Sequence, residues 1–489
     1  MFFATISKPA GKATLAVLLS LHLLAAPARA QERLPARLPA VRLPAPNESE
    51  EVVAAPVPTE LRLEDFEGMA LQYNPTISQA AWAVENARGV MQQSGLYPNP
   101  NIGYLRTDPN NNRDSQRQGG LFSQTIVTGR KLQLNRNVES HEVNALAWEL
   151  DAQRMRVVND VRLRYYELLA AQQALSVSRD LVRIADEGAQ LADKAFQAKE
   201  GNKSDLLQAR IQRNEVRLAL KDAENRFTSS WQQMTAIMGL PDLQPARVIG
   251  DLRRNDPPLT FENSWQELVS RSPQIFTAQA RVDRAKALYQ RALVEPIPDV
   301  TVQVIGERDS TMRSSSLSTL VAIPLPVFNR NQGNIRSTHA EIHEAENEVE
   351  RVQLALRDQL ATTFRRYETS RNQVAQYEKE ILPDAKENLD LSVQAFRAGE
   401  IKFLNVLIAR QTYFQTNLSY IDSLAEQRKT EVEINGLLLT GGGLNPAAIG
   451  TAIQQTSAAG RLRVQGLLNQ SQQDRAGQFL PAAGQVGGN

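Results

Sequence analysis

The chain has 489 residues, 42% of them apolar and 6% aromatic, and its 55 basic and 54 acidic side chains leave a net charge of +1. A charge this close to zero gives no electrostatic reason to expect binding to nucleic acid. The sequence contains no cysteine, which excludes disulfides, thiolate metal sites, thiol nucleophiles and a lipid-bearing cysteine.

The first 30 residues are predicted to be a signal peptide for export. Lys8 and Lys12 precede an apolar run that extends from Ala13 to Ala26, and Ala28-Arg29-Ala30 follows as a small-residue cleavage site. The run is shorter than the roughly 20 apolar residues that a spanning helix needs. Since no later stretch is long enough, a mature chain in a membrane would have to cross it as strands.

The rest of the chain is internally duplicated. Residues 195–210 read AFQAKEGNKSDLLQAR, and residues 395–410 read AFRAGEIKFLNVLIAR, with seven identities at a spacing of 200 positions. Three prolines repeat at a spacing of 198 positions, so that Pro75, Pro98 and Pro100 correspond to Pro273, Pro296 and Pro298. A period this long indicates two whole subdomains and not a short-repeat solenoid.

Composition sets the limits of these subdomains. Residues 31–60 are rich in proline and are predicted to form a linker. Residues 441–489 are rich in Gly, Ala, Gln and Ser, and are predicted to form a mobile low-complexity tail. Between them lie repeat one (61–242), a connector (243–260) and repeat two (261–440).

Each repeat is predicted to begin with a helix of about 20 residues. Asn74-Pro75 and Ser272-Pro273 place a side-chain acceptor at the N-cap and a proline at the first helical position. Each helix is expected to end before a proline pair, because proline disfavours the helical conformation in the residue before it.

A β-hairpin is predicted to follow each of these helices. In repeat two, Val300, Val302 and Val304 share one face of a strand, and a second strand with Thr319 and Val321 follows a polar turn near 309–316. Repeat one offers Ile102 and Tyr104, a polar turn over 110–117, and a second strand over 121–127.

Long helices are predicted for the remainder of each repeat. The first could extend from Arg130 to Ala198, nearly 70 residues or about 100 Å, and a return helix of about 35 residues follows a turn that uses Gly201 or Gly399. Heptad spacing indicates a coiled-coil seam in each copy: Val161, Tyr165, Leu168, Gln172 and Leu175 in one, and Phe403, Leu407, Arg410, Phe414 and Asn417 in the other.

These elements define a mainly α fold with a small β part. Four strands cannot close a membrane barrel, since the smallest known barrels have eight. Three copies related by cyclic symmetry would give a β-barrel of 12 strands that continues into an α-helical barrel. Strands that alternate apolar and polar residues suit a wall with lipid outside and water inside, so the sequence predicts a duct.

The stretch from about 61 to 440 resembles the TolC-type outer-membrane efflux duct family. The similarity lies in Asn74-Pro75, in Leu96-Tyr97-Pro98-Asn99-Pro100, in residues 323–333 (IPLPVFNRNQG) and in the paired Ala-Phe-x-Ala turns. The resemblance implies a homotrimer in the outer membrane, with its helical part in the periplasm, that docks to a periplasmic adaptor and an inner-membrane pump. Residues 323–333 are most similar to the cobalt-zinc-cadmium efflux branch, which implies metal cations as substrate.

Two alternatives remain open at this point. The same duct could serve type I protein secretion or multidrug efflux, and only the partner pump separates these functions. A structural coiled-coil protein of the cell envelope is the alternative of another class, and it predicts an elongated particle that needs no detergent.

In the resembled family, the helix-turn-helix tips form the periplasmic entrance and contact the adaptor. The resemblance assigns two groups of residues to this region: Glu200, Lys203 and Asp205 in one tip, and Glu400, Lys402 and Asn405 in the other. Three copies of Asp205 would attract cations to the mouth; the alternative is that Asp205 caps the return helix. Asn405 and Ile408 occupy positions that are often carboxylates in multidrug members. Opening is expected to be iris-like, with the tips moving outward on adaptor contact.

Other features are expected to be structural. Phe196, Phe396, Leu207 and Leu407 are predicted to pack between helices. His339 and His343 have a spacing that could share a metal ion, but a solvated helical face is favoured. We expect no catalytic residues, no cofactor and no enzymatic activity.

Overall fold

The computed structural model describes residues 60–107, 117–199, 201–253, 257–309, 313–401 and 403–444, all within the compact unit Glu50–Asn489. The predicted signal peptide, nearly all of the linker and residues 445–489 of the predicted tail lie outside the described residues. Glu200 and Lys402 of the predicted entrance also lie outside them.

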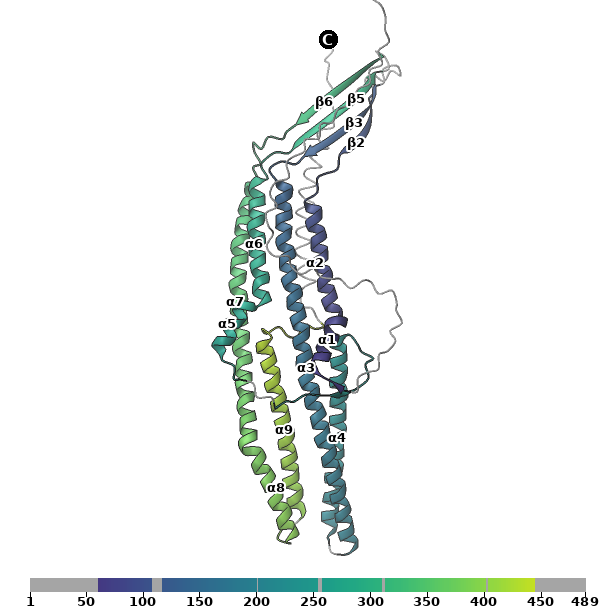
Figure 1. Cartoon of the computed structure of the whole chain (residues 1–489), viewed down its shortest axis with the longest axis vertical. Coiled ribbons are helices and arrows are strands. Elements are labelled where there is room, and N and C mark those ends of the chain that lie inside the picture. Colours follow the sequence, from purple (N-terminus) through teal and green to yellow (C-terminus); the bar gives the residue numbers. More distant parts are fainter. Residues whose placement is uncertain are drawn as a thin grey trace, which may run out of the picture. The chain divides into compact units, whose positions relative to one another are not determined.

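The described residues form a mainly helical structure with a small sheet, as predicted (Figure 1). In chain order the elements are β1 (Glu60–Leu61), α1 (Leu63–Tyr73), α2 (Pro75–Ser94), β2 (Asn101–Thr107), β3 (Arg117–Ile126), α3 (Lys131–Gln197), α4 (Lys203–Met238), β4 (Arg247–Val248), α5 (Phe261–Arg271), α6 (Pro273–Val294), β5 (Val300–Asp309), β6 (Ser314–Ala322), α7 (Gln332–Gln376), the π-helical segment η1 (Tyr377–Ile381), α8 (Leu382–Arg397) and α9 (Phe403–Asn435). No helix in this part of the chain is both long and apolar enough to cross a bilayer.

The helix lengths follow the sequence predictions. Helix α3 has 67 residues, α4 has 36 and α9 has 33. Pro75 and Pro273 lie at the start of α2 and α6, and Pro98, Pro100, Pro296 and Pro298 lie between those helices and the strands that follow.

The two helix starts differ in their caps. Asn74 Oδ1 accepts from the backbone N–H of Thr76 at 2.9 Å, as predicted. The predicted cap by Ser272 is wrong, because its Oγ is buried without a hydrogen-bond partner. The start of α6 is fixed by its backbone instead, since the carbonyl of Ser272 accepts from Ile275 and Phe276 at 3.1 and 3.2 Å.

The two predicted hairpins form one antiparallel sheet in the order β2-β3-β5-β6. Strands β3 and β5, one from each repeat, pair over their full length, from Arg117↔Asp309 to Ile126↔Val300. The turn of the second hairpin is tighter than predicted, because Ser314 pairs with Asp309 inside the ladder. Strands β2 and β6 are the edges of this sheet.

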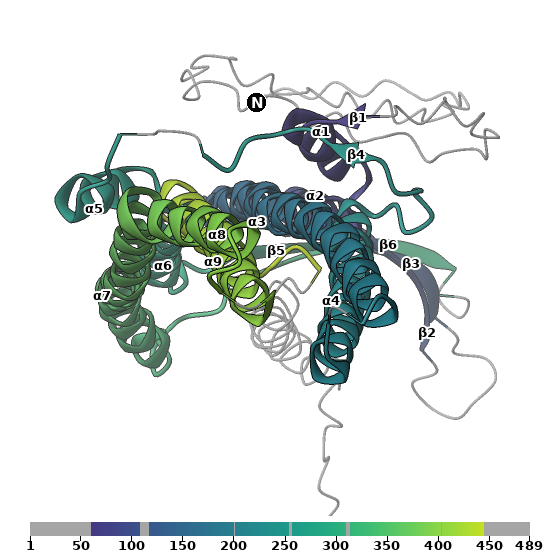
Figure 2. The same cartoon turned by 90° about the horizontal axis from the view of Figure 1, so that it is seen from below.

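The long helices form one curved layer (Figures 1 and 2). Helix α3 packs against α2 and α4 on one side and against α6 and α9 on the other; α7 packs against α6 and α9, and α8 against α9. Helices α1 and α5 and strands β1 and β4 lie on the outer side of the layer (Figure 2). We call the opposite side the inner side. The layer has two free flanks, formed by α2 and α4 and by α7 and α8.

The core lies where α1, β4 and the connector cover the layer. Val161, Leu168 and Leu175 of the predicted seam are buried, and Tyr165 Oη donates to the carbonyl of Ile249 at 2.6 Å. The seam predicted for α9 is less deeply buried than that of α3, because Leu407 is buried and its other four positions are only partly buried. Helix α9 contacts α3, α7 and α8, so its buried residues are spread over two flanks and do not follow one stripe.

Candidate functional site

The two helical turns that the sequence assigns to the entrance lie together at the end of the helical layer opposite the sheet (Figure 1). One joins α3 to α4 and the other joins α8 to α9. Lys203 and Asp205 lie in the first turn of α4, Asn405 lies in the first turn of α9, and Glu400 is exposed in the second connection.

Asp205 does not cap α4, so the alternative reading of this residue is wrong. The cap is Asn202, whose Oδ1 accepts from the backbone N–H of Asp205 at 2.8 Å. Asparagine is among the best N-cap residues, and this local signal was available in the sequence. The Asp205 carboxylate is half-buried in the first turn of the helix, where the helix dipole favours negative charge.

The prediction that Gly201 reverses the chain is also wrong. The left-handed residue after α3 is Lys199, with φ of 66°, whereas its counterpart after α8 is Gly399, with φ of 77°. The backbone N–H of Gly201 donates to the carbonyl of Ala195 at 3.0 Å and closes the turn. A lysine in the left-handed region is strained relative to a glycine, because its Cβ approaches the backbone.

We therefore expect Lys199→Gly to stabilise the α3–α4 tip by about 0.5 kcal/mol, the relief of strain less the extra entropy of glycine. Amide hydrogen exchange over residues 195–206 should slow about twofold. The control Lys194→Gly lies inside α3 and should speed exchange, since glycine costs about 1 kcal/mol in a helix. Faster exchange in Lys199→Gly would contradict the assigned turn.

Ion pairs connect the helices of the first tip. Arg210 of α4 binds Asp193 of α3 at 2.9 Å, and Arg217 binds Asp186 at 2.8 Å. These pairs are half-exposed, so each contributes modestly. The first tip is thus a single hairpin held by charges on both of its helices.

Packing at the tips is looser than the sequence indicates. Leu407 is 8% exposed, and the ring of Phe396, although 41% exposed, lies 5.4 Å from the ring of Phe403 on α9, so the packing prediction is confirmed for these two residues. Phe196 and Leu207 are 40% and 46% exposed. Leu207, Ile211 and Leu218 lie on one exposed stripe of α4, which belongs to a free flank of the layer.

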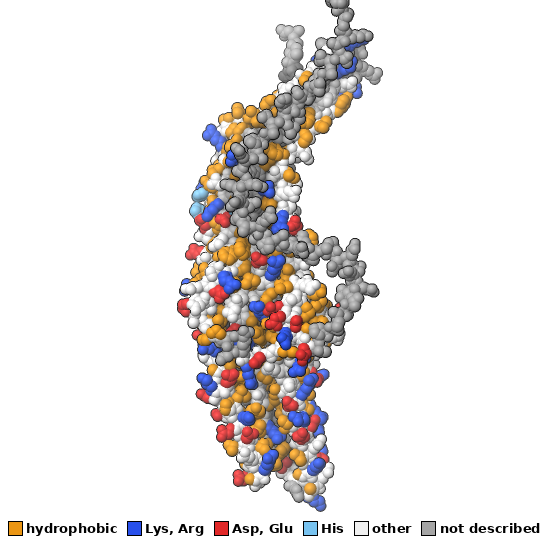
Figure 3. Space-filling model, in the orientation of Figure 1, with side chains coloured by type: hydrophobic (Ala, Val, Ile, Leu, Met, Phe, Trp, Pro, Cys, Tyr) orange, Lys and Arg blue, Asp and Glu red, His pale blue; other side chains and the backbone are white. Residues whose placement is uncertain are grey.

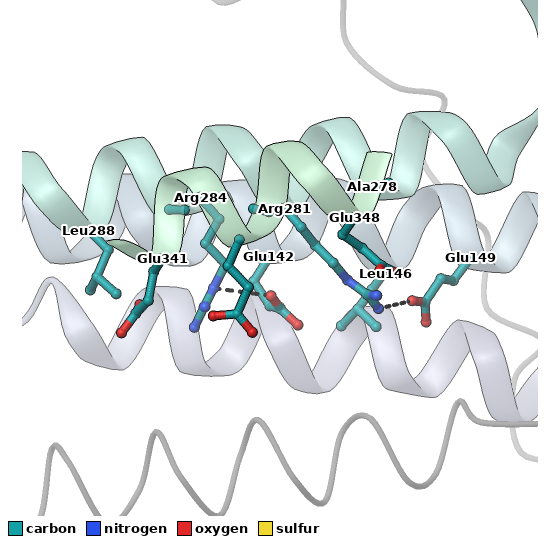
Figure 4. Close-up of a pocket in the computed structure, with 12 residues that line it drawn as sticks. Glu142, Leu146, Glu149, Ala278, Arg281, Arg284, Leu288, Glu341 and Glu348 are labelled. Carbon is teal, nitrogen blue, oxygen red and sulfur yellow. Dashed lines mark hydrogen bonds and ion pairs between the residues drawn. The ribbon is translucent and has the colours of Figure 1, made fainter. Parts of the chain in front are cut away.

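The inner side of the layer carries a polar groove of about 380 Å³ between α3, α6 and α7 (Figure 4). Glu149 precedes the outward-facing Tyr165 by sixteen residues, about four and a half helical turns, and therefore points to the inner side. Arg281 of α6 binds Glu149 at 2.5 Å, and Arg284 binds Glu142 at 3.1 Å. These pairs tie repeat one to repeat two.

Negative charge exceeds positive charge in this groove. Five glutamates line it, namely Glu142, Glu149, Glu341, Glu344 and Glu348, against two arginines, Arg281 and Arg284. Burial raises the pKa of Glu149, the Arg281 guanidinium opposes this shift, and neighbouring Glu142 adds to it. Ion pairs offset part of this charge, with Glu142 bound to Arg284, Glu149 to Arg281 and Glu348 to Arg351. The remaining excess of negative charge can attract cations.

The described residues contain no group of three or more His, Asp and Glu side chains that could hold a metal ion. The rings of His339 and His343 are 5.1 Å apart, the ring of His339 contacts that of Tyr289, and His343 Nδ1 lies 3.1 Å from a Glu346 carboxylate oxygen. Both histidines face solvent on α7 with these neighbours.

The sheet has two chemically distinct faces. One face aligns Ile102, Phe122 and Val304 in one row and Tyr104 and Leu317 in another. Three of these side chains are strongly exposed, Ile102 at 84%, Leu317 at 77% and Tyr104 at 71%. The other face is mixed: one row aligns Asn101, Ser123 and Gln303 with Leu320, and the next aligns Leu121 and Ile305 with Ser318.

Figure 3 shows hydrophobic side chains over the strands on the visible side and both signs of charge interspersed along the helices. The face with Ile102, Tyr104 and Leu317 suits lipid, and the more polar opposite face suits water. The two-faced sheet continues directly into helices whose inner side is charged.

Comparison with known proteins gives the family. The model of the outer membrane efflux protein family matches residues 68–240 and 265–438, so the chain belongs to the outer membrane efflux protein family. It is the outer-membrane channel component of an efflux system.

Three relatives illustrate the similarity. The chain is 27% identical to the cobalt-zinc-cadmium resistance protein CzcC of Cupriavidus metallidurans over 378 residues, 77% of this chain and 90% of that protein. It is 24% identical to the pyoverdine export outer membrane protein OpmQ of Pseudomonas putida over 359 residues, 67% of this chain and 75% of that one. The crystal structure of CusC superposes with a TM-score of 0.65 at 17% identity, covering 78% of this chain and 92% of CusC, which supports the fold.

Proposed function

We propose that this channel conducts metal cations from the periplasm to the exterior, as the duct of a tripartite pump. The main support is the similarity to CzcC, a cobalt-zinc-cadmium resistance protein, along 90% of its length. The excess of glutamates in the inner groove also favours cations over anions. The duct itself is passive, and energy comes from an inner-membrane pump that a periplasmic adaptor connects to the tips.

We further propose that the working unit is a homotrimer with its helical part in the periplasm. Strands β2 and β6 expose unpaired edges, and such edges bind another strand readily. The helical flanks beside them, α2 with α4 and α7 with α8, have no partner in the described chain. Edge-to-edge association of copies around a threefold axis satisfies both the strand edges and the flanks, and the groove then faces the passage.

Deletion of the gene from its native host tests the substrate. We expect lower tolerance of zinc, cobalt and cadmium, restored by the wild-type gene, with siderophore secretion unchanged. The purified protein should be trimeric in mild detergent and conduct in planar bilayers. Unchanged metal tolerance together with loss of siderophore export would favour the second candidate, an exporter of organic molecules, for which the similarity to the pyoverdine exporter OpmQ is the supporting observation.

The entrance residues give a test of cation attraction. We expect Asp205→Asn to lower the cation-to-anion permeability ratio about twofold, because three copies of the carboxylate are removed from the mouth. Its counterpart in repeat two is Asn405, so Asn405→Asp should raise the ratio. Reversal potentials in a salt gradient measure both changes. Equal potentials in the wild type and both variants would exclude a role for these positions in selectivity.

A further inference from the structure

One of the two long helices is interrupted. Helix α3 continues for 67 residues, whereas the corresponding stretch of repeat two is divided into α7 with 45 residues, η1 with 5 and α8 with 16. Pro383 lies in the first turn of α8 and has no N–H to donate to the preceding turn. The backbone N–H of Leu382 donates instead to the carbonyl of Tyr377, five residues back. Such π-helical segments occur frequently at functional sites.

A tyrosine from α9 holds this segment in place. Tyr420 is 3% exposed, and its Oη donates to Glu378 Oε1 at 2.6 Å. Its ring also lies 6.3 Å from the ring of Tyr377. Burial raises the pKa of Tyr420 to about 12, with the bond to Glu378 acting in the same direction and Arg253 opposing it. The phenol therefore stays protonated and able to donate at neutral pH.

The same tyrosine connects the segment to the outer side of the layer. The guanidinium of Arg253, in the connector after β4, lies 5.5 Å from the centroid of the Tyr420 ring. Eight residues further along α9, Arg428 Nε donates to the carbonyl of Leu252 at 2.9 Å. The connector thus contacts α9 at two points, and the contact at Tyr420 lies beside η1.

Below this contact the second tip is held by packing, with the ring of Phe396 on α8 lying 5.4 Å from the ring of Phe403 on α9. Helix α8 packs against α9 and borders a free flank, whereas the first tip is braced by the pairs of Asp193 with Arg210 and Asp186 with Arg217. A helix with a weakened hydrogen-bond ladder at one point, packed on one side only, bends at that point. Helix α9 also packs against α3, where Phe403 lies against Gly188, so bending at η1 would shift this contact while the unbroken helix α3 stays in place.

We infer that η1 is the hinge about which the α8–α9 hairpin moves when the entrance opens, and that Tyr420 locks this hinge through Glu378 and reports the position of the outer connector through Arg253. This inference rests on the proposed function, since it assigns a movement to the proposed entrance. Contact with a partner on the outer side at the connector would then release the hinge.

Tyr420→Phe tests the lock in the full-length, detergent-solubilised protein. The bond to a carboxylate is lost while the ring remains, and amide exchange over residues 378–401 should accelerate about tenfold. Exchange over residues 195–206 in the first tip should not change. Tyr413→Phe is the control, because Tyr413 lies two turns earlier on α9 and has no side-chain hydrogen bond among the contacts of the described residues.

Glu378→Gln provides a second variant at an exposed position, where misfolding is not a concern. It replaces a charged acceptor by a weaker neutral one and should accelerate exchange over 378–401 about threefold. Rates equal to those of Tyr413→Phe in both variants would overturn the inference. Hydrogen exchange does not require conduction, so a wild-type protein that fails to conduct refutes the proposed function, and the exchange rates decide the hinge separately.

Discussion

Leu317→Arg is expected to prevent formation of channels in the outer membrane. Leu317 is 77% exposed on the apolar face of β6, in a row with Tyr104. If this face contacts lipid, a guanidinium there costs about 2–4 kcal/mol near the bilayer midplane. The variant protein should be absent from outer-membrane fractions, and metal tolerance should fall to that of the deletion strain.

The neighbouring residue provides the control for this prediction. Ser318 follows Leu317 in the same strand and pairs with Ile305, so its side chain points to the opposite face. Ser318→Arg should therefore reach the membrane in near-normal amount and change conductance instead. Equal recovery of the two variants from membranes would contradict the assignment of the lipid face.

The second large effect is expected at Asp160, a 7% exposed carboxylate on α3. Its Oδ1 accepts from the backbone N–H of Gly441, and its Oδ2 accepts from that of Gly443, both at 2.7 Å. Asp160→Ala removes two charge-assisted bonds and leaves the N–H of Gly443 unpaired in a buried region, whereas Gly441 is exposed. We expect a loss of about 3 kcal/mol or more in unfolding free energy.

Thermal unfolding in detergent, followed by circular dichroism, measures this loss. Asp160→Asn should have an intermediate melting temperature, because its amide oxygen can still accept one of the two bonds. Asp151→Ala is the matched control on the same helix, since Asp151 is half-exposed and pairs only with Arg154 three residues away. It should change stability by no more than about 0.5 kcal/mol. A similar shift for Asp151→Ala and Asp160→Ala would show that Asp160 is not an anchor.

The anchored segment also shows what the sequence could not predict. Asn159 Nδ2 donates to the carbonyls of Gly436 and Leu439, and Gln153 Nε2 donates to that of Gly442. Each partner is more than 270 positions away in the chain. No periodicity or spacing marks such a contact, because it depends on where α9 ends in space.

Local signals were more informative. Proline at the start of α2 and α6, alternation in β2 to β6 and the length of α3 follow from preferences of the backbone within a few residues, and these predictions are confirmed. The predictions were wrong where two neighbouring residues were equally suitable for the same position in a cap or a turn. Asn202 and Asp205 are both acceptable caps, and Lys199 takes a conformation for which Gly201 was the better candidate.

The candidate site was predicted in outline. The sequence indicated which residues lie near the tips, but not the ion pairs across α3 and α6, whose members are separated by 132 residues in the case of Glu149 and Arg281. Pro383 was the one local signal for η1. The bond from Tyr420 on α9 to Glu378 in η1 had no local signal, because its partners lie 42 residues apart.

The interruption by η1 makes the two halves of the duplicated chain mechanically unequal. The α3–α4 hairpin begins with an unbroken helix, whereas the α8–α9 hairpin follows a helix that η1 interrupts. Around a threefold axis, stiff and jointed hairpins would alternate, so the six tips would not act alike. When the entrance changes its width, the three jointed tips would move and the three stiff tips would not. The opening would therefore have threefold symmetry, although three copies of a duplicated chain place six similar hairpins around the axis.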